Sequence, residues 1–85
     1  MSDYSMKRAP DARRYFGVGN TTFYEWIRAG LMTPGILIGG RSKAWPTREL
    51  NAIAAARIAS KSDDDIRQLV RKLVAARSQA DQSVA

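Results

Sequence analysis

The stretch Val18–Gly30, VGNTTFYEWIRAG, decides how this chain folds. Asn20 or Thr21 can begin a helix there by accepting a hydrogen bond from an orphan backbone N–H. Gly30 can end the helix, because a left-handed backbone costs glycine little. Apolar side chains recur three and four residues apart and therefore share one face: Phe23, Trp26 and Ile27. The stretch predicts a short amphipathic helix with two aromatic rings on its inner face.

The opposite face of this helix carries hydroxyl and charged side chains: Thr21, Thr22, Glu25 and Arg28. Two interpretations fit the pattern equally well. One is an ordinary amphipathic core helix. The other is the second helix of a helix-turn-helix, whose first residues reach base edges in the major groove of DNA.

The preceding residues favour a helix-turn-helix. A helix is predicted over about 11–16, since Pro10 suits a first helical turn and Asp11 suits the positive end of the helix dipole. Its inward candidates are Ala12, Tyr15 and Phe16. Gly17–Gly19 forms the turn, with Val18 between the two helices. Residues 1–8 show no periodicity, so we expect a flexible arm whose Lys7 and Arg8 are solvated or touch phosphates.

After Gly30 the sequence predicts a β-hairpin. Ile36–Ile38 is β-prone, Gly39–Ser42 is loop-like, and Lys43–Trp45 forms the returning strand. A lone hairpin is marginally stable, so Ile36, Ile38 and Trp45 are expected to pack on the helices. The tip is polar and basic, with three candidate DNA contacts: Arg41, Ser42 and Lys43. A merely solvated turn is the alternative, but the two glycines favour close approach to a ligand.

Two further helices are predicted. The first follows Pro46 and has an apolar stripe: Leu50, Ile53, Ala54 and Ile58. The second is capped by Ser62, with Asp65 three residues later. Its stripe consists of Ile66, Leu69, Val70, Leu73 and Val74. This stripe either completes the chain's own core or forms an interface with a second copy. The predicted division is 1–8 arm, 9–59 DNA-binding domain, 60–78 C-terminal helix and 79–85 flexible tail.

Composition points away from catalysis and toward an anionic partner. The 85 residues contain no cysteine and no histidine, and so small a domain has no room for a large enclosed active site. The only carboxylate cluster, Asp63–Asp65, suits a first helical turn. We expect no enzyme activity, cofactor, metal or membrane span, and a cytoplasmic location. Net charge is +6, and residues 1–58 hold nine Lys/Arg against four Asp/Glu, which favours a polyanion as partner.

From about Pro10 to Ile58 the chain resembles the AlpA-like and excisionase-like phage regulators, which are related in fold to the DNA-binding part of MerR regulators. The residues that carry the resemblance are Gly17-Val18, Thr21–Tyr24, Ile27, Gly30, Pro34, Gly39–Arg41, Trp45 and Glu49-Leu50. It implies a winged helix-turn-helix, mainly α with a small β-hairpin wing, plus the C-terminal helix. It also implies a sequence-specific double-stranded-DNA-binding protein, either an excisionase (a recombination directionality factor) or a transcriptional regulator. The resemblance suggests an integrase or recombinase as partner. It also suggests that copies of the chain form a homodimer or assemble cooperatively on DNA.

The resemblance also implies roles for individual residues. It implies that bases or nearby phosphates of the DNA are contacted by Asn20, Thr21, Thr22 and Tyr24. It implies that Arg28 contacts the phosphate backbone of the DNA. Two departures occur, with Gly19-Asn20 in place of the family's Ser-Arg and Glu25 in place of a basic residue. Glu25 either accepts a hydrogen bond from a cytosine amino group or pairs with Arg28 or Arg14, and the ion pair is the favoured interpretation.

Two other functions compete with DNA reading. A protein–protein adaptor would use the Ile66–Val74 stripe as its main surface. A DNA-packaging recognition subunit shares the winged module, but the C-terminal part here is short for gathering a motor.

Overall fold

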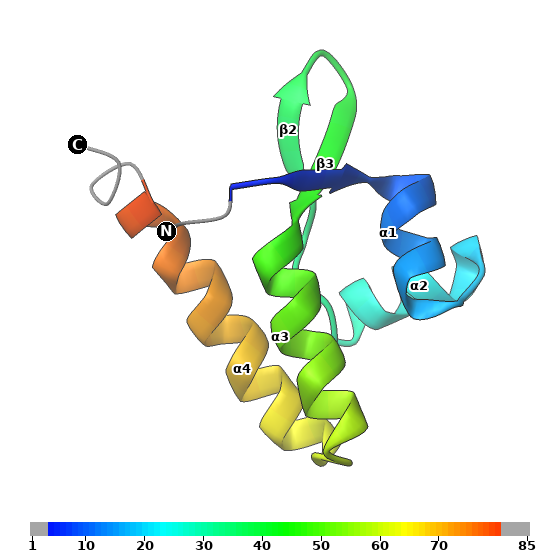
Figure 1. Ribbon diagram of the computed structural model, residues 1–85, viewed down its shortest axis with the longest axis vertical. Helices are drawn as coiled ribbons and strands as arrows, with labels where there is room; N and C mark the ends of the chain where they lie inside the picture. The colour runs from blue at the N-terminus through cyan, green and yellow to red at the C-terminus, as the bar shows by residue number, and fades with distance from the viewer. Residues whose placement is uncertain (1–3, 81–85) are drawn as a thin grey trace.

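A computed structural model of the protein describes residues 4–80, which form four α-helices and one three-stranded antiparallel sheet (Figure 1). In chain order the elements are β1 (Met6–Arg8), α1 (Ala9–Phe16), α2 (Asn20–Arg28), β2 (Ile36–Gly39), β3 (Ser42–Pro46), α3 (Thr47–Ile58), α4 (Asp63–Ala76) and the short 3-10 helix η1 (Arg77–Gln79). The mainly helical fold class with a small hairpin is therefore confirmed. Residues 1–3 and 81–85, which belong to the predicted arm and tail, lie outside the described part.

The sheet contains a strand that the sequence did not indicate. Its order is β1-β3-β2, and β1 pairs antiparallel with β3, with Arg8 opposite Ala44. The prediction of a flexible arm is therefore wrong for Met6–Arg8. Three residues are too few to show a side-chain period, and the pairing depends on the free backbone edge of β3. The Thr47 N–H extends the contact by donating to the Ser5 carbonyl at 2.9 Å.

The helix ends of α1 and α2 explain the two glycines that follow them. Gly17 and Gly30 have φ values of +68° and +79°. The next N–H in each case reaches back to the last turn, from Leu31 to the Trp26 carbonyl at 2.8 Å and from Val18 to Arg13 at 3.2 Å. This pattern satisfies carbonyls that a helix end leaves unpaired.

The start of α2 differs from the prediction. Gly19, rather than Asn20 or Thr21, is the N-cap residue, and within residues 4–80 no side chain caps this helix. Asn20 is already helical, so its amide is not used for capping. The side chains at the start of α2 are thus left pointing to solvent.

Aromatic rings form the centre of the core. Phe23 and Trp45 are fully buried, with ring centroids 5.1 Å apart and an edge-to-face arrangement. Around them lie the other buried apolar residues: Ala12, Leu31, Met32, Leu50, Ile53, Ile66 and Val70. Because Trp45 belongs to β3 and Phe23 to α2, this contact fixes the hairpin against the second helix.

Three residues expected in the core are exposed instead. Tyr15 lies at the surface, where its hydroxyl bonds to the Asn51 side-chain oxygen. Ile38 is 50% exposed because β2 is irregular between Leu37 and Gly39, and Ile58 is 85% exposed as the last residue of α3. Near the ends of helices and strands, the hydrophobic period of the sequence no longer determines whether a side chain points into the core.

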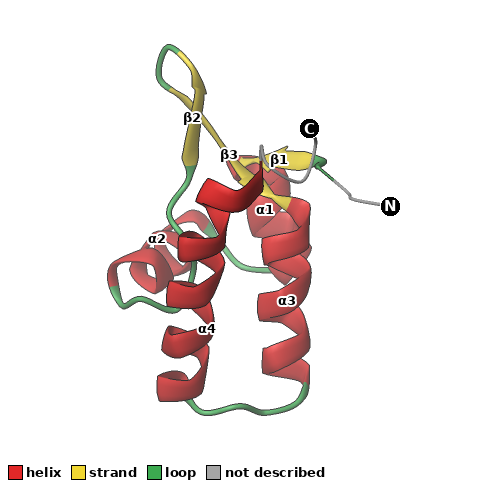
Figure 2. Cartoon of the chain, turned by 90° about the vertical axis from the view of Figure 1, so that its left-hand side faces the viewer, coloured by secondary structure: helices red, strands yellow, loops and turns green. Residues whose placement is uncertain are grey.

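Helix α4 completes the core of its own chain. Ser62 caps it, accepting a hydrogen bond from the Asp65 N–H at 3.1 Å as predicted. Helices α3 and α4 run side by side (Figures 1 and 2), and the α4 stripe packs inward. Ile66 and Val70 are buried and Leu69 and Leu73 partly buried, whereas Val74 is 36% exposed. The core alternative thus accounts for this stripe without a second copy.

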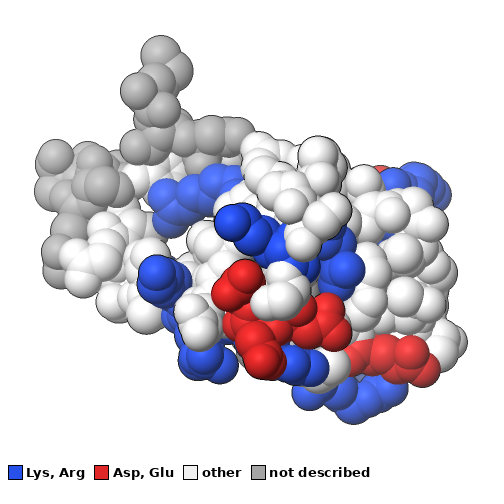
Figure 3. All heavy atoms as spheres, turned by 90° about the horizontal axis from the view of Figure 1, so that it is seen from below, with Lys and Arg blue, Asp and Glu red and all other residues white. Residues whose placement is uncertain are grey.

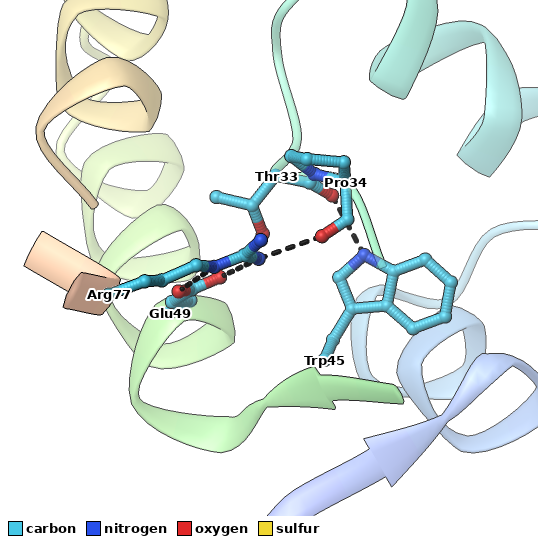
Figure 4. Close-up of polar contacts among 5 residues, drawn as sticks. All are labelled: Thr33, Pro34, Trp45, Glu49 and Arg77. Atoms are coloured by element: carbon cyan, nitrogen blue, oxygen red, sulfur yellow. Dashed lines mark hydrogen bonds and ion pairs between the residues drawn. The ribbon is translucent and has the colours of Figure 1, made fainter. Parts of the chain in front are cut away.

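A buried ion pair joins η1, directly after α4, to α3, and a hydrogen bond from the same arginine reaches the base of the hairpin (Figure 4). Arg77 donates to both carboxylate oxygens of Glu49, at 2.9 and 2.8 Å, and to the Pro34 carbonyl at 2.7 Å. Glu49 is only 2% exposed, so this arginine is its charge partner in a low-dielectric site. Next to the pair, the Trp45 indole N–H donates to the Thr33 carbonyl at 2.7 Å. Together these bonds position the segment from which β2 emerges.

Candidate nucleic-acid interface

Helix α2 has a packed inner face and an exposed outer face. Phe23 is buried, and Trp26 and Ile27 pack against the core. The opposite face is exposed and polar, and it contains most of the predicted contact residues: Asn20, Thr21, Thr22, Glu25 and Arg28. Because the inner face is anchored by aromatic packing, the orientation of the outer side chains is set by the fold.

The favoured ion pair of Glu25 does not form. Arg14 pairs with Asp11 instead, at 3.1 Å, one helical turn away in α1. Among residues 4–80 neither Arg14 nor Arg28 pairs with Glu25. The carboxylate of Glu25 is therefore exposed on the outer face of α2 and available to an external donor.

The hairpin of β2 and β3 projects from the body of the molecule (Figures 1 and 2). Its turn uses Gly40 at φ +53°, next to Gly39 at φ +157°. Arg41 and Lys43 are exposed at and beside this turn, and Ser42 is partly buried. The projecting hairpin with a basic end agrees with the sequence prediction.

A hollow of about 520 Å³ connects the hairpin to the helices. We call it the cationic hollow, and its lining residues are Arg8, Ala9, Pro10, Tyr24, Arg41, Ser42 and Lys43. It brings the three hairpin candidates together with Tyr24 of α2. The other predicted site residues are not part of it and remain on the outer face of α2.

Arg8 is the candidate site residue whose position was hardest to predict from the sequence. It ends β1, and its guanidinium donates to the Ser42 hydroxyl oxygen at 3.2 Å. The sequence shows a basic residue two positions before Pro10, which is a weak signal. Only the pairing of β1 with β3 shows that this residue lies beside the hairpin.

The charges around the hollow are uncompensated. Three arginines of the described chain have carboxylate partners: Arg14, Arg67 and Arg77. Within residues 4–80, Arg8, Arg41 and Lys43 form no ion pair, and none of the residues lining the hollow is acidic. Such an arrangement attracts anions.

Acidic side chains gather at the other end of the molecule. Asp63–Asp65 occupy the first turn of α4, at the lower end of Figure 1, and the view from that end shows a group of acidic atoms with basic ones around it (Figure 3). Their position at a helix N-terminus is the one that the helix dipole favours. The hairpin end is thus the more cationic end.

Comparisons with known proteins give one informative similarity. Over 54 residues the chain is 37% identical to "Uncharacterized protein ORF88" of Enterobacteria phage P4. The match covers 64% of this chain and spans 61% of the length of the phage protein. No protein-family model and no solved structure matches. None of the helices described for residues 4–80 is long and apolar enough to cross a membrane.

Proposed function

We propose that this protein is a sequence-specific double-stranded-DNA-binding protein with a winged helix-turn-helix fold. In this proposal α1 and α2 are the helix-turn-helix and the β2–β3 hairpin is the wing. The observation that carries the proposal is the cationic hollow, where three cations without an ion-pair partner in residues 4–80 lie beside Tyr24 of α2 and the end of the hairpin. A cluster of cations without carboxylate partners, next to an exposed polar helix face, is the arrangement expected of a DNA-binding protein.

The exposed face of α2 would supply base recognition in the major groove. The amide of Asn20 can pair with adenine, and the free carboxylate of Glu25 can accept from a cytosine amino group. A good base contact of this kind contributes about 1–3 kcal/mol of discrimination. Thr21 and Thr22 add hydroxyl contacts, and Arg28 supports them by holding the phosphate backbone, which fixes the register.

The biological role we propose is that of a phage or mobile-element regulator, either an excisionase or an AlpA-type transcriptional regulator. The family resemblance and the similarity to a phage P4 protein support it. Such a protein breaks no bonds and acts by occupying DNA, alone or with a recombinase. One module buries only about 600–1,000 Å² on DNA, so we expect several copies to bind cooperatively.

The structure weakens the case for an adaptor. That function would need the stripe of α4 as a docking surface, but Ile66 and Val70 are already inside the core. We therefore retain DNA binding as the single proposed function.

The test is fluorescence-anisotropy binding to a random-sequence duplex and to DNA flanking the gene, across a salt series. We expect log affinity to fall linearly with log salt concentration, and the flanking DNA to bind more tightly. Asn20→Ala should reduce the preference, whereas Arg71→Ala, which removes an exposed cation of α4, should preserve it. Absence of binding at low salt would overturn the proposal.

A further inference from the structure

We infer that the cationic hollow is the binding site for one phosphate group of the DNA backbone, with Arg8 as a direct ligand. The inference rests on the proposed DNA-binding function. It goes beyond that function by assigning the phosphate to a defined position and by adding a residue from β1 to the interface.

The chemistry of the lining residues matches a phosphodiester. Arg8 and Arg41 offer guanidinium groups, Lys43 an ammonium group, and Tyr24 and Ser42 hydroxyl groups. A phosphodiester presents negatively charged oxygen acceptors, to which guanidinium donates in a two-pronged geometry. All of these side chains can donate a hydrogen bond, and no acidic residue of the described chain lines the hollow to compete with the ligand.

The backbone reinforces the positive potential. Arg8 is the N-cap residue of α1, and Ala9 and Pro10 of its first turn also line the hollow. The start of a helix carries a partial positive charge. Pro10 itself has no N–H to donate, and the first-turn carboxylate of Asp11 offsets part of this charge. The hollow therefore combines three formal charges with the dipole of an eight-residue helix.

Arg8 is held in place without being neutralised. The register of β1 on β3 sets its backbone position, with Arg8 opposite Ala44. Its bond to the neutral Ser42 hydroxyl uses one guanidinium nitrogen and leaves the others for a ligand. A site that is ordered beforehand loses less entropy on binding.

The position of the hollow gives the phosphate a role. Its walls come from the start of α1, the middle of α2 and the end of the hairpin. A phosphate held there would be contacted by all three elements at once. This contact would set the angle at which α2 enters the groove while the hairpin follows the backbone.

The first experiment compares salt dependence for wild type, Arg8→Ala and Arg71→Ala on one duplex. Loss of one phosphate contact should lower the magnitude of the log–log slope by about 0.9 and the affinity by about tenfold, to a similar extent on all sequences. Arg8→Lys should keep the slope, because the charge is retained. Arg71→Ala is the matched control and should leave the slope unchanged. Thermal unfolding of each variant checks that the fold is intact.

The second experiment locates the phosphate. Single phosphates of a selected binding site are replaced by uncharged methylphosphonates. We expect one position at which the replacement weakens wild type more than it weakens Arg8→Ala, because both changes remove the contact between Arg8 and this phosphate, while Arg41 and Lys43 still respond to its charge.

The outcomes separate the two proposals. If wild type does not bind DNA, the proposed function fails. If wild type binds but Arg8→Ala keeps the full slope, the phosphate site is wrong and DNA binding stands. Titration with inorganic phosphate, followed by NMR of the Arg8 side chain, tests the other source of this ligand. Saturable binding of free phosphate together with an unchanged DNA slope would identify a free-anion site and overturn the assignment to DNA.

Discussion

Arg77 and Arg41 illustrate two uses of the same side chain in two regions of the molecule. Arg77 is the first residue of η1 and is mostly buried, with both carboxylate oxygens of Glu49 in α3 as partners. Arg41 lies at the hairpin turn, exposed, and forms no ion pair within residues 4–80. Net charge therefore says little about binding by itself. In the proposed complex, a cation that is already paired would release few counterions from DNA, and the attraction would come from Arg8, Arg41 and Lys43, which form no ion pair within residues 4–80.

Two other arginines, like Arg77, have partners within the fold. The guanidinium of Arg57 stacks over the Trp26 ring at 4.0 Å, and Arg67 donates to the Ala29 carbonyl at 2.8 Å. These contacts connect the C-terminal end of α2 to α3 and to α4. Arg57 of α3 and Arg67 of α4 thus support the end of α2. Around the hairpin, Arg8, Arg41 and Lys43 form no ion pair within residues 4–80.

The strongest test of this division removes the buried pair. Arg77→Ala leaves the Glu49 carboxylate buried without a charge partner and removes the bond to Pro34, so we expect a loss of about 3–5 kcal/mol in the free energy of unfolding. Urea denaturation followed by tryptophan fluorescence measures it. Arg71→Ala, also in the C-terminal part but exposed, should cost less than about 0.5 kcal/mol. A loss below about 1 kcal/mol for Arg77→Ala would show that water reaches the pair.

A smaller effect is expected at the contact between α4 and α2. Arg67→Ala removes a hydrogen bond to a helix-end carbonyl and the packing of the side chain near Gly30, which should cost about 1 kcal/mol. Asp64→Ala is the control, because it removes the exposed ion pair and one carboxylate at the start of α4 but leaves the contact with the Ala29 carbonyl, and it should cost about 0.5 kcal/mol. Equal losses in the two variants, measured by urea denaturation, would assign the effect to the ion pair rather than to the carbonyl contact.

The sequence predicted what local patterns encode. The period of α2 identified Phe23 as an inward residue, and glycines between β-prone runs located the hairpin with Trp45 returning to the core. These signals lie within a few residues of one another, so they need no knowledge of the fold.

Long-range pairing escaped the prediction. Glu49 and Arg77 are 28 positions apart, and nothing in either local pattern indicates that they meet. Arg8 was misplaced for the same reason, because β1 is three residues long and exists through the edge of β3. The favoured ion pair of Glu25 with Arg14 does not form, because Asp11, one turn before Arg14 in α1, pairs with that arginine.

The smallest expected effect lies at the corner between α3 and α4. Ser60 has φ +58°, a left-handed conformation that costs a residue with a side chain about 1–2 kcal/mol, whereas glycine loses about 0.5–1 kcal/mol more chain entropy on folding. Ser60→Gly should therefore stabilise the protein by about 0.5 kcal/mol, measured by urea denaturation.

This corner lies at the end of the molecule away from the hairpin (Figure 1), so the same variant should bind DNA with unchanged affinity and salt slope. Ser60→Ala, which keeps the strained backbone, is the matched control and should not gain stability. A change in DNA affinity without a change in net charge would mean that the α3–α4 region also touches the duplex. In that case α3 and α4 would be part of the DNA interface. Their cations could then no longer be assigned to stabilising the fold alone.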